Sequence, residues 1–571
     1  MKIRLASHTG FCMGVRQAVL RIVHEMDSST EELYVYGPLI HNPQTVEALE
    51  ARGMRTISDL TAIEGKRVVV RTHGIPRHEL RAIKERAAGL INLTCPRVAR
   101  VQSLIKKYAL QGYHTVIIGD RDHAEVIGLK SYASSGVTII DSPQDVSTIP
   151  EATQILVVSQ TTFDRNLFTE IASRISRSQS GAIVFDTICD ATRNRQEGVI
   201  AGIKDGIDTL VIVGGKNSAN TKRLAEIGRE SGVRTLHVET EDELPDDEFV
   251  DSKNVLVTAG TSTPGWIINN VLERLYTIRH RKRSAPLRAA MFLLQTAVRT
   301  NILAAASAFI LSMMFLSVCG GAADPWIAII APLYIFAMHT VNNFVDRLNL
   351  RLTNPYKFSL YQRHGHALMA AATASCAASC ILAWRYGITP AILVGVSCLL
   401  GFIYNAGPIR RIVSSLPSRT MRRLYRSKLV AVFGWIVIVA VIPLSIIPFR
   451  PLETVFMSFL IFVFVFLRSI LLDMIAFQGD LIAGRDTLPV WIGHRHLTRI
   501  STALALAAIA VTVLFAVMKN EPLFALLALP IGYQLALLAV IIRLNYLIAL
   551  KYELLVDMTI IALAACCVAL C

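Results

Sequence analysis

The feature that most restricts the fold of this chain is a set of apolar runs near 20 residues long, which recur from about Ala289 to Cys571. The hydrocarbon core of a bilayer offers no water to backbone groups, so such runs fold as membrane-spanning helices. Before about Tyr276 the apolar runs are short and alternate with charged amphipathic stretches. The sequence therefore predicts a soluble first half followed by an all-α, multi-span membrane half.

This change in composition predicts three segments: a first domain over residues 1–278, a linker over 279–288 and an integral membrane domain over 289–571. The linker is rich in Lys and Arg, which favours a juxtamembrane position against anionic headgroups. We expect about nine spans, near residues 301–319, 325–345, 367–386, 388–406, 429–449, 454–474, 500–518, 522–542 and 552–571.

The basic residues of the membrane half lie mainly between the predicted spans. The chain has 58 Lys and Arg against 43 Asp and Glu, an excess that nucleic-acid-binding proteins also have. Its position between spans instead follows the positive-inside rule. We therefore expect a lipid bilayer and no nucleic acid as partner. The N-terminus has no signal-peptide pattern, so we expect the first domain in the cytoplasm and the membrane half in the cell inner membrane.

Three cysteines of the first half stand at similar intervals. Cys12, Cys95 and Cys189 each lie between a strand-like run and a helix-like run, which predicts three similar lobes with one thiolate each. An odd number of cysteines in a reducing compartment favours ligands or free thiols over disulfides. Three converging thiolates can hold a metal or an iron–sulfur centre and leave one coordination position open for chemistry.

The same half repeats a unit of strand, polar loop and helix. Such β–loop–α units predict mainly parallel sheets covered by helices, with ligands at the carboxyl ends of the strands. Three histidines, His41, His73 and His123, lie in loops of this kind, as do Glu125 and Thr161. One such residue alone usually has a packing role or is exposed to solvent. Because all of them lie at equivalent strand ends, they favour a common binding or catalytic site.

These residues lie in motifs that resemble the 4-hydroxy-3-methylbut-2-enyl diphosphate reductases, the LytB/IspH family, which perform the last step of the methylerythritol phosphate route to isoprenoids. The resemblance covers about residues 1–275. The motifs are GFCMGV, HN at 41–42, THG at 72–74, TCP at 94–96, HAEVIG at 123–128, SQTT at 159–162, ICDATRNRQ at 188–196, NSAN at 217–220 and TAGTSTP at 258–264.

The resemblance implies three α/β lobes in pseudo-threefold arrangement around a central [4Fe–4S] cluster held by Cys12, Cys95 and Cys189. It implies reductive removal of the substrate hydroxyl to give isopentenyl and dimethylallyl diphosphate, with a ferredoxin or flavodoxin as electron donor. Glu125 would be the catalytic proton relay. The substrate-binding residues would be His41, His73, His123, Thr161, Ser218, Asn220 and Ser262. The family's usual Ser-Ser-Asn loop contains Ala219 in this chain, so one side-chain donor to the diphosphate is missing.

Polar residues at the predicted spans carry a second resemblance. The stretches around Asn342, Asp346, Asp473 and Asp480, together with GFIYNAGPIRR at 401–411, are similar to the UbiA superfamily of intramembrane prenyltransferases. That resemblance implies a Mg²⁺ site for a prenyl diphosphate. Both aspartate motifs are depleted here, since Asn343, Leu350 and Ala476 replace expected carboxylates. A modified prenyltransferase and a non-catalytic membrane scaffold therefore both stay open.

Two further alternatives concern the cysteines. Of the seven in the membrane half, Cys376 and Cys380 have no nearby cluster of His or acidic residues and are typical of small packing residues. Cys566, Cys567 and Cys571 end an apolar tail and are interpreted as likewise inert, with lipidation as the lesser alternative. The alternative to a reductase is a membrane-tethered metal or redox-sensing module, in which the three cysteines of the first half hold zinc or a cluster without reductase activity.

Overall fold

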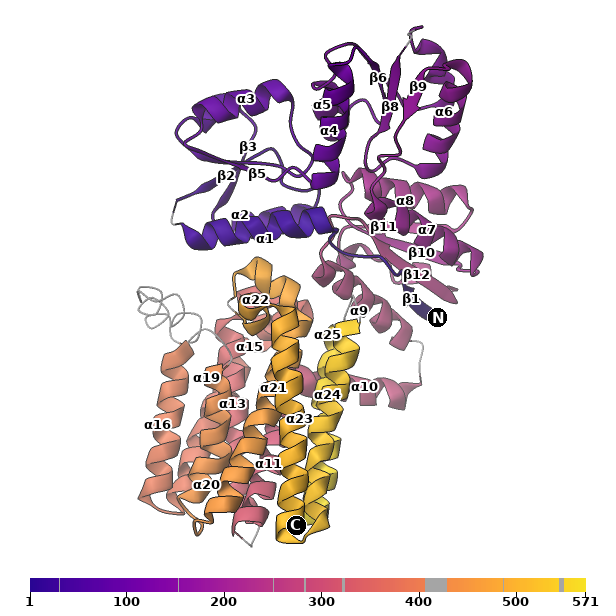
Figure 1. Ribbon diagram of the computed structural model, residues 1–571. Helices are drawn as coiled ribbons and strands as arrows, with labels where there is room; N and C mark the ends of the chain where they lie inside the picture. Colours follow the sequence, from indigo (N-terminus) through magenta and orange to yellow (C-terminus); the bar gives the residue numbers. More distant parts are fainter. Residues whose placement is uncertain are drawn as a thin grey trace. The chain divides into compact units, whose positions relative to one another are not determined.

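The computed structural model describes the chain except residues 30, 152–153, 250, 282–283, 321–323, 406–428, 486, 544–548 and 571. The described chain forms two compact units (Figure 1). The first is an α/β unit over Met1–Arg279, which also includes the short stretch Ile482–Gly484, and the second is a helical unit over His280–Leu481 and Arg485–Cys571.

The α/β unit contains three four-stranded sheets in which every strand pair is parallel. The strand orders are β1-β12-β10-β11, β3-β2-β4-β5 and β7-β6-β8-β9, which confirms three α/β lobes (Figure 1). Their bounds are β1 Lys2–Leu5, β2 Leu33–Tyr36, β3 Met54–Ile57, β4 Arg67–Val70, β5 Gly89–Asn92, β6 His114–Ile118, β7 Val137–Ile140, β8 Ile155–Ser159, β9 Ala182–Val184, β10 Thr209–Val213, β11 Arg234–Val238 and β12 Asn254–Ala259.

The central strands are short and apolar because both of their faces are covered. β8 (ILVVS) and β10 (TLVIV) are buried along their whole length, as parallel strands between helix layers are. The covering helices are α1 Met13–Ser28, α2 Pro43–Glu50, α3 Arg77–Arg86, α4 Pro96–Ala109, α5 Ala124–Lys130, α6 Arg165–Ser178, α7 Asp190–Lys204, α8 Ala219–Glu230 and α9 Gly265–Arg281. These layers leave the ends of the strands as the place where polar side chains gather.

Three of these helices pass from one lobe to the next. The helix α1 follows β1 and reaches the second lobe, where Glu25 accepts a 2.7 Å hydrogen bond from Arg67 of β4. Likewise α4 follows β5 of the second lobe and packs on β6 and β8 of the third, and α7 follows β9 of the third and packs on α8 and β12 of the first. The lobes are therefore connected in a ring by three equivalent crossovers.

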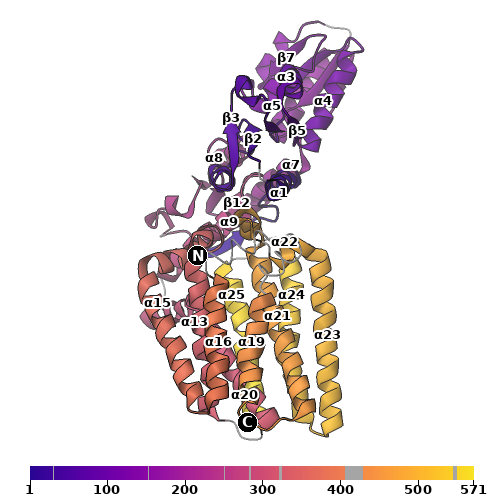
Figure 2. The ribbon, with the colours of Figure 1, turned by 90° about the vertical axis from the view of Figure 1, so that its left-hand side faces the viewer.

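The helical unit holds seven helices long and apolar enough to cross a membrane among its described residues. Their long axes run roughly parallel (Figure 2). These candidate spans are Ile302–Gly320, Pro325–Val345, Pro355–Trp384, Pro451–Ala483, His494–Lys519, Pro522–Ile542 and Lys551–Leu570. The helices that form these spans are α11 Ile302–Gly320, α12 Pro325–Ala328, α13 Ile330–Val345, α15 Pro355–Trp384, α21 Pro451–Ala483, α23 His494–Lys519, α24 Ala528–Arg543, α25 Ala549–Asp557 and α26 Thr559–Leu570, and the ends of α24 and α25 extend slightly beyond the span limits.

The two other predicted spans appear as shorter apolar helices, Ile388–Tyr404 and Leu429–Leu444. The first lies within α16 Ile388–Asn405, and the second contains α19 Leu429–Ile436 and α20 Ile442–Leu444. Both border residues 406–428, which lie outside the described residues, as does most of the 401–411 motif.

The span predicted to begin near residue 367 begins earlier in the structure, at Pro355. The helix α15 begins at Pro355 because Asn354 caps it, its side chain accepting the Lys357 N–H at 3.0 Å.

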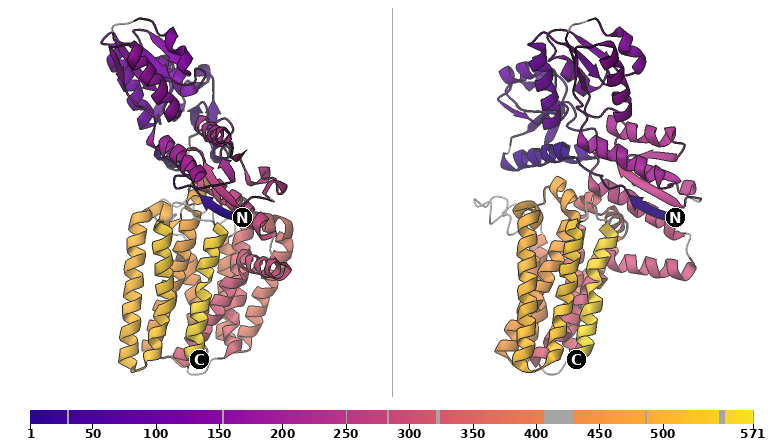
Figure 3. Two further views of the ribbon diagram at one scale, coloured as in Figure 1. Left: turned by 90° about the vertical axis from the view of Figure 1, so that its right-hand side faces the viewer. Right: turned by 45° about the vertical axis from the view of Figure 1, so that its right-hand side comes forward.

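The helical unit begins with an amphipathic helix, α10 Ala285–Arg299. It lies across the direction of the long helices (Figures 1 and 3). Its large apolar side chains Leu287, Phe292 and Leu293 are exposed, which is typical of a helix lying in a membrane interface. The remaining short helices are α14 Arg347–Thr353 and α22 Leu488–Ile492.

Candidate active site

The three predicted cysteine ligands occupy equivalent positions in the three lobes. Cys12, Cys95 and Cys189 are the N-cap residues of α1, α4 and α7, and all three thiols are free and half-buried. Each cysteine follows one strand of a parallel pair, and a threonine stands two residues after the other strand of that pair. The cysteine N–H donates to the threonine carbonyl in every lobe: Cys12 to Thr261 at 3.0 Å, Cys95 to Thr72 at 2.9 Å and Cys189 to Thr161 at 2.9 Å.

The thiols lie close to one another. A Cβ added at Gly14, in the first turn of α1, would lie 2.6 Å from Cys95 Sγ, so a side chain at this position would displace the Cys95 thiol. Burial raises the pKa of the Cys12 and Cys95 thiols, and each further feels the charge of Cys189. A metal bound to these sulfurs would replace their protons. Among the described residues no three His, Cys, Asp or Glu side chains converge on one metal ion, whereas the cysteines of an iron–sulfur cluster bind different irons.

A buried arginine that the sequence did not single out stands beside Cys12. Arg195 of α7 is 4% exposed; it donates to Ala259 O at 3.1 Å, to Ala191 O at 2.8 Å and to Gly10 O. Its guanidinium lowers the pKa of Cys12 against the larger effect of burial. It therefore fastens the Cys12 loop to α7, the helix whose N-cap is Cys189. Arg195 lies in the motif ICDATRNRQ at 188–196, but the motif alone assigns this arginine no role.

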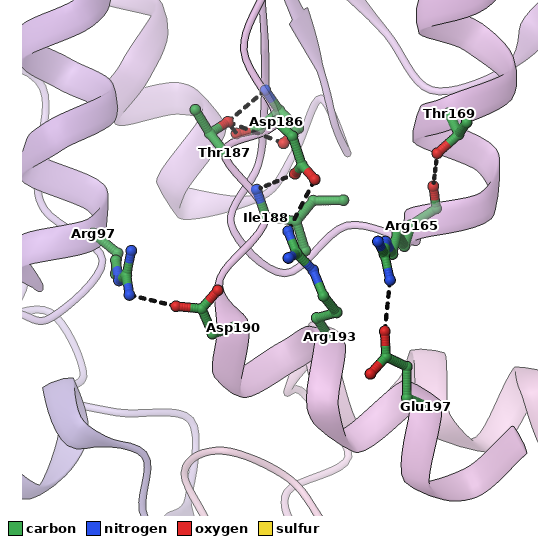
Figure 4. Close-up of polar contacts among 10 residues, drawn as sticks. Arg97, Arg165, Thr169, Asp186, Thr187, Ile188, Asp190, Arg193 and Glu197 are labelled. Carbon is green, nitrogen blue, oxygen red and sulfur yellow. Dashed lines mark hydrogen bonds and ion pairs between the residues drawn. The ribbon is translucent and has the colours of Figure 1, made fainter. Parts of the chain in front are cut away.

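Ion pairs lie on both sides of the Cys189 loop (Figure 4). Arg97, two residues after Cys95, pairs with Asp190, the neighbour of Cys189, and so ties two of the cysteine loops together. On the other side Arg193 Nη2 lies 2.9 Å from Asp186 Oδ2, and Asp186 Oδ1 also accepts the Ile188 N–H at 3.1 Å. These contacts fix the direction in which the loop presents its thiol.

The three predicted histidines form one cluster. The ring centroids of His41 and His73 are 4.5 Å apart, those of His41 and His123 are 6.1 Å apart, and those of His73 and His123 are 5.8 Å apart. Burial lowers the pKa of all three, that of His123 to about 4, and the Arg71 guanidinium lowers each further. The imidazoles are therefore neutral at pH 7 in the ligand-free protein. His123 Nδ1 accepts the Glu125 N–H at 3.2 Å, which assigns the His123 proton to Nε2.

Glu125 is the buried carboxyl group of the site, with 1% of its surface exposed. It accepts two hydrogen bonds from Thr161, one from the backbone N–H at 2.7 Å and one from Oγ1 at 2.8 Å. Burial raises the pKa of Glu125 to about 7, although both hydrogen bonds favour the carboxylate. The Thr161 carbonyl also accepts the Cys189 N–H, so one residue links the acid to a cysteine loop.

A pocket with an empty volume of about 320 Å³ joins the histidines to the loops of the first lobe. Its lining residues are Val15, Ile40, His41, His73, His123, Thr162, Ser218, Ala219, Asn220, Thr261 and Ser262. Ser262 Oγ donates to His41 O at 3.0 Å and holds the second lobe against the first. Within the part of the chain that the structure describes, the buried Nδ2 and Oδ1 of Asn220 and the Nδ1 of His73 have no hydrogen-bond partner. Buried polar atoms of this kind indicate a polar ligand.

Comparison with known proteins identifies the family. Residues 3–276 match the family described as LytB protein. A 4-hydroxy-3-methylbut-2-enyl diphosphate reductase from Alkaliphilus oremlandii is 38% identical over 277 residues, which are 48% of this chain and 99% of that relative. The chain belongs to the LytB family.

Two solved structures are similar to parts of this LytB chain. One is described as (E)-4-hydroxy-3-methyl-but-2-enyl diphosphate reductase, the terminal enzyme of the non-mevalonate pathway, with 34% identity and a TM-score of 0.39 over 48% of this chain and 100% of that one. The other is a UbiA homologue from Archaeoglobus fulgidus bound to GPP and Mg²⁺, with 16% identity and a TM-score of 0.34 over 48% of this chain and 99% of that one.

The helical unit of the LytB chain holds the four residues predicted to bind Mg²⁺. Asn342 lies near the end of α13 and Asp346 directly follows that helix, while Asp473 and Asp480 are both buried and both lie on α21. Arg485 lies within ion-pair distance of both Asp346 and Asp480 and thereby brings these two together. The metal site itself stays a prediction.

Proposed function

We propose that this LytB chain reduces (E)-4-hydroxy-3-methylbut-2-enyl diphosphate to isopentenyl diphosphate and dimethylallyl diphosphate. The observation that carries the proposal is the pairing of Glu125 with Thr161 beside a cluster of neutral histidines and three equivalent cysteines. The name of the Alkaliphilus relative, which matches over 99% of its length, supports the same reaction.

The donor set fits a [4Fe–4S] cluster held by Cys12, Cys95 and Cys189. Three free thiols at equivalent helix N-caps, with no fourth cysteine among the described residues of this unit, match a cluster with one open iron. When bound, the cluster would pass on two electrons, one at a time, from the external electron donor and would act as a Lewis acid on the substrate oxygen. The carbon–oxygen bond breaks, two protons are consumed, and the hydroxyl leaves as water.

The chain's own residues supply the proton for that leaving group. Glu125 has a pKa of about 7, so a substantial fraction of it carries a proton at neutral pH. In its protonated form the carboxyl group donates to Thr161 Oγ1, and Thr161 in turn donates to the substrate hydroxyl. Burial of the carboxyl group keeps bulk water away from this relay.

The remaining pocket residues bind the diphosphate. His123 offers an Nε2–H donor, and Asn220 offers an unpartnered buried amide at the N-terminus of α8, where backbone N–H groups also point outward. Ser218 and Ser262 add hydroxyls, and His41 and His73 complete the wall. Arg71 and Lys222 stand near enough to lower the pKa of His41, and this positive potential favours an anion.

The relay predicts a basic limb in the pH profile. Only protonated Glu125 donates, so kcat is expected to hold below pH 7 and to fall as the pH rises through about 7. In Thr161→Val the hydroxyl that passes the proton to the substrate is lost, so kcat is expected to be low at every pH and to show no limb near pH 7. Steady-state kinetics with an artificial reductant measure both profiles. A flat wild-type profile between pH 6 and pH 9 would contradict the assignment.

We expect that Ala219 weakens binding of the diphosphate substrate and that Ala219→Ser restores it. Ala219 is the first residue of α8 and lines the pocket, so Ala219→Ser adds a hydroxyl facing the diphosphate. A hydrogen bond to a charged group contributes roughly 1.5–3 kcal/mol, which corresponds to a KM lower by about tenfold or more with kcat unchanged. Kinetics of the two proteins test this. The exposed Ser173→Ala on α6 is a control that should change neither constant.

For the helical unit we propose that its spans hold the reductase at the cell inner membrane, with the α/β unit in the cytoplasm. The seven candidate spans and the exposed apolar side chains of α10 support a bilayer as partner. A ferredoxin or flavodoxin is the proposed electron donor. Modified prenyl transfer and a scaffold role both stay open for this unit.

The deciding experiment is anaerobic turnover of the hydroxylated diphosphate by the purified full-length protein. Brown protein with broad absorbance near 400 nm, bleached by dithionite and altered by substrate, is expected together with release of both five-carbon products. Colourless, zinc-loaded protein without turnover would instead establish the alternative, a metal or redox-sensing module.

A further inference from the structure

An arginine lies between two of the carboxylates for which the sequence predicts Mg²⁺. Arg485 Nη2 is 3.3 Å from Asp346 Oδ2, and Arg485 Nη1 is 3.4 Å from Asp480 Oδ1. Each terminal nitrogen of the guanidinium thus faces a different carboxylate. Asp346 ends α13 and Asp480 lies in the last turn of α21, so the arginine joins two helices of the bundle.

The end of α21 directs Arg485 to this place. Gly484 has a φ of +70°, a left-handed conformation that ends helices and that glycine adopts without strain. The chain therefore turns back on itself, and the Arg485 N–H donates to Asp480 O at 2.8 Å. The backbone bond and the side-chain ion pair hold Arg485 against the same aspartate.

We propose that Arg485 is the resident cation of this site and that Asp346 and Asp480 therefore bind no Mg²⁺ in the native chain. The Asp480 side chain is 2% exposed, and a carboxylate so deeply buried needs a counter-charge. The planar guanidinium provides it with two nitrogens that fit two carboxylates. Mg²⁺ requires a near-octahedral shell of oxygens at about 2.0–2.1 Å, so it reaches these oxygens only after the guanidinium has left.

The depleted motifs agree with this arrangement. Asn343 stands where the resemblance expects a further aspartate, and its Nδ2 lies 3.4 Å from both Asn301 Oδ1 and Tyr361 Oη, in a helix-to-helix contact. With fewer carboxylates, the site has less negative charge to attract a divalent ion. The single positive charge of Arg485 neutralises a larger share of the negative charge that is left. This inference does not depend on the proposed reductase activity.

Binding of Mn²⁺, a Mg²⁺ substitute visible by electron paramagnetic resonance, tests the proposal in full-length protein solubilised in detergent. We expect Mn²⁺ binding to be the same in wild-type protein and in Asp480→Asn, because wild-type Asp480 binds no metal ion. We also expect that Mg²⁺ does not raise the Tm of the wild type. In Arg485→Gln we expect Mn²⁺ affinity to rise at least tenfold and Mg²⁺ to raise Tm. The added Asp480→Asn change should abolish both effects.

A matched control removes a different cation of the same unit. Lys519→Gln breaks the ion pair with Glu453, and we expect it to create no Mn²⁺ site. Wild-type Mn²⁺ binding that Asp480→Asn abolishes would overturn the proposal, and so would folded Arg485→Gln protein without Mn²⁺ binding. If Arg485→Gln does not fold, the comparison of wild type with Asp480→Asn still decides.

Discussion

Replacing Glu125 with glutamine is expected to lower kcat by roughly 10²–10⁴-fold while the cluster stays in place. The glutamine amide has the same shape as the carboxyl group and still accepts the Thr161 N–H, which Glu125 accepts at 2.7 Å. It has no proton with a pKa of about 7 to give, so the relay through Thr161 Oγ1 stops. Anaerobic turnover and the visible spectrum measure the two effects separately.

The matched control is Glu170→Gln on α6, which removes an exposed carboxylate paired with Arg174. Such surface pairs contribute little, so its turnover and spectrum should equal those of the wild type. Substrate binding to Glu125→Gln should persist, because the histidines and Asn220 are unchanged. Turnover of Glu125→Gln equal to that of the wild type would refute the proton-relay assignment.

The three lobes could be predicted from sequence because their signals are local. A short apolar strand followed by a polar loop and a helix predicts a parallel α/β unit, and Cys12, Cys95 and Cys189 each stand at that junction. The histidine cluster follows from the same rule, since the carboxyl ends of parallel strands gather their loops. The equivalent positions of the cysteines needed no long-range information.

Other features depend on contacts between residues far apart in sequence. Arg195 bonds Gly10 O and Ala259 O, and nothing in its own segment reports that these carbonyls are near. The Thr72, Thr161 and Thr261 carbonyls that accept the cysteine N–H groups became apparent only through strand pairing. Arg485 likewise reads as one of several basic residues between spans, because the sequence does not show that α13 and α21 end at the same place.

The boundaries of the membrane spans were harder to predict than their existence. Hydropathy finds the apolar centre of a helix, whereas its end is decided by capping. Asn354 starts α15 within a polar stretch, so the helix includes a first third that hydropathy leaves out. The helix α15 is longer than its apolar run indicated, whereas the helix Ile388–Tyr404 is shorter than the predicted span within the described chain.

Replacing Cys95 with serine is expected to remove the cluster itself. A serine hydroxyl stays protonated near neutral pH and is a poor ligand for iron, so only Cys12 and Cys189 would remain. The iron content should fall from roughly four atoms per chain to below about one, with loss of the absorbance near 400 nm and of turnover. The fold should persist, because the Cys95 N–H still donates to Thr72 O and Pro96 still begins α4.

Cys380→Ser separates this effect from the general cost of changing a cysteine. Cys380 lies half-buried on α15 in the helical unit, so its serine variant should keep the iron content, the spectrum and the turnover of the wild type. Equal loss of iron in both variants would point to damage during preparation, and repetition under stricter exclusion of oxygen would separate them. Full iron in Cys95→Ser would remove Cys95 from the ligand set, and with it the equivalence of the three lobes on which the proposed site depends.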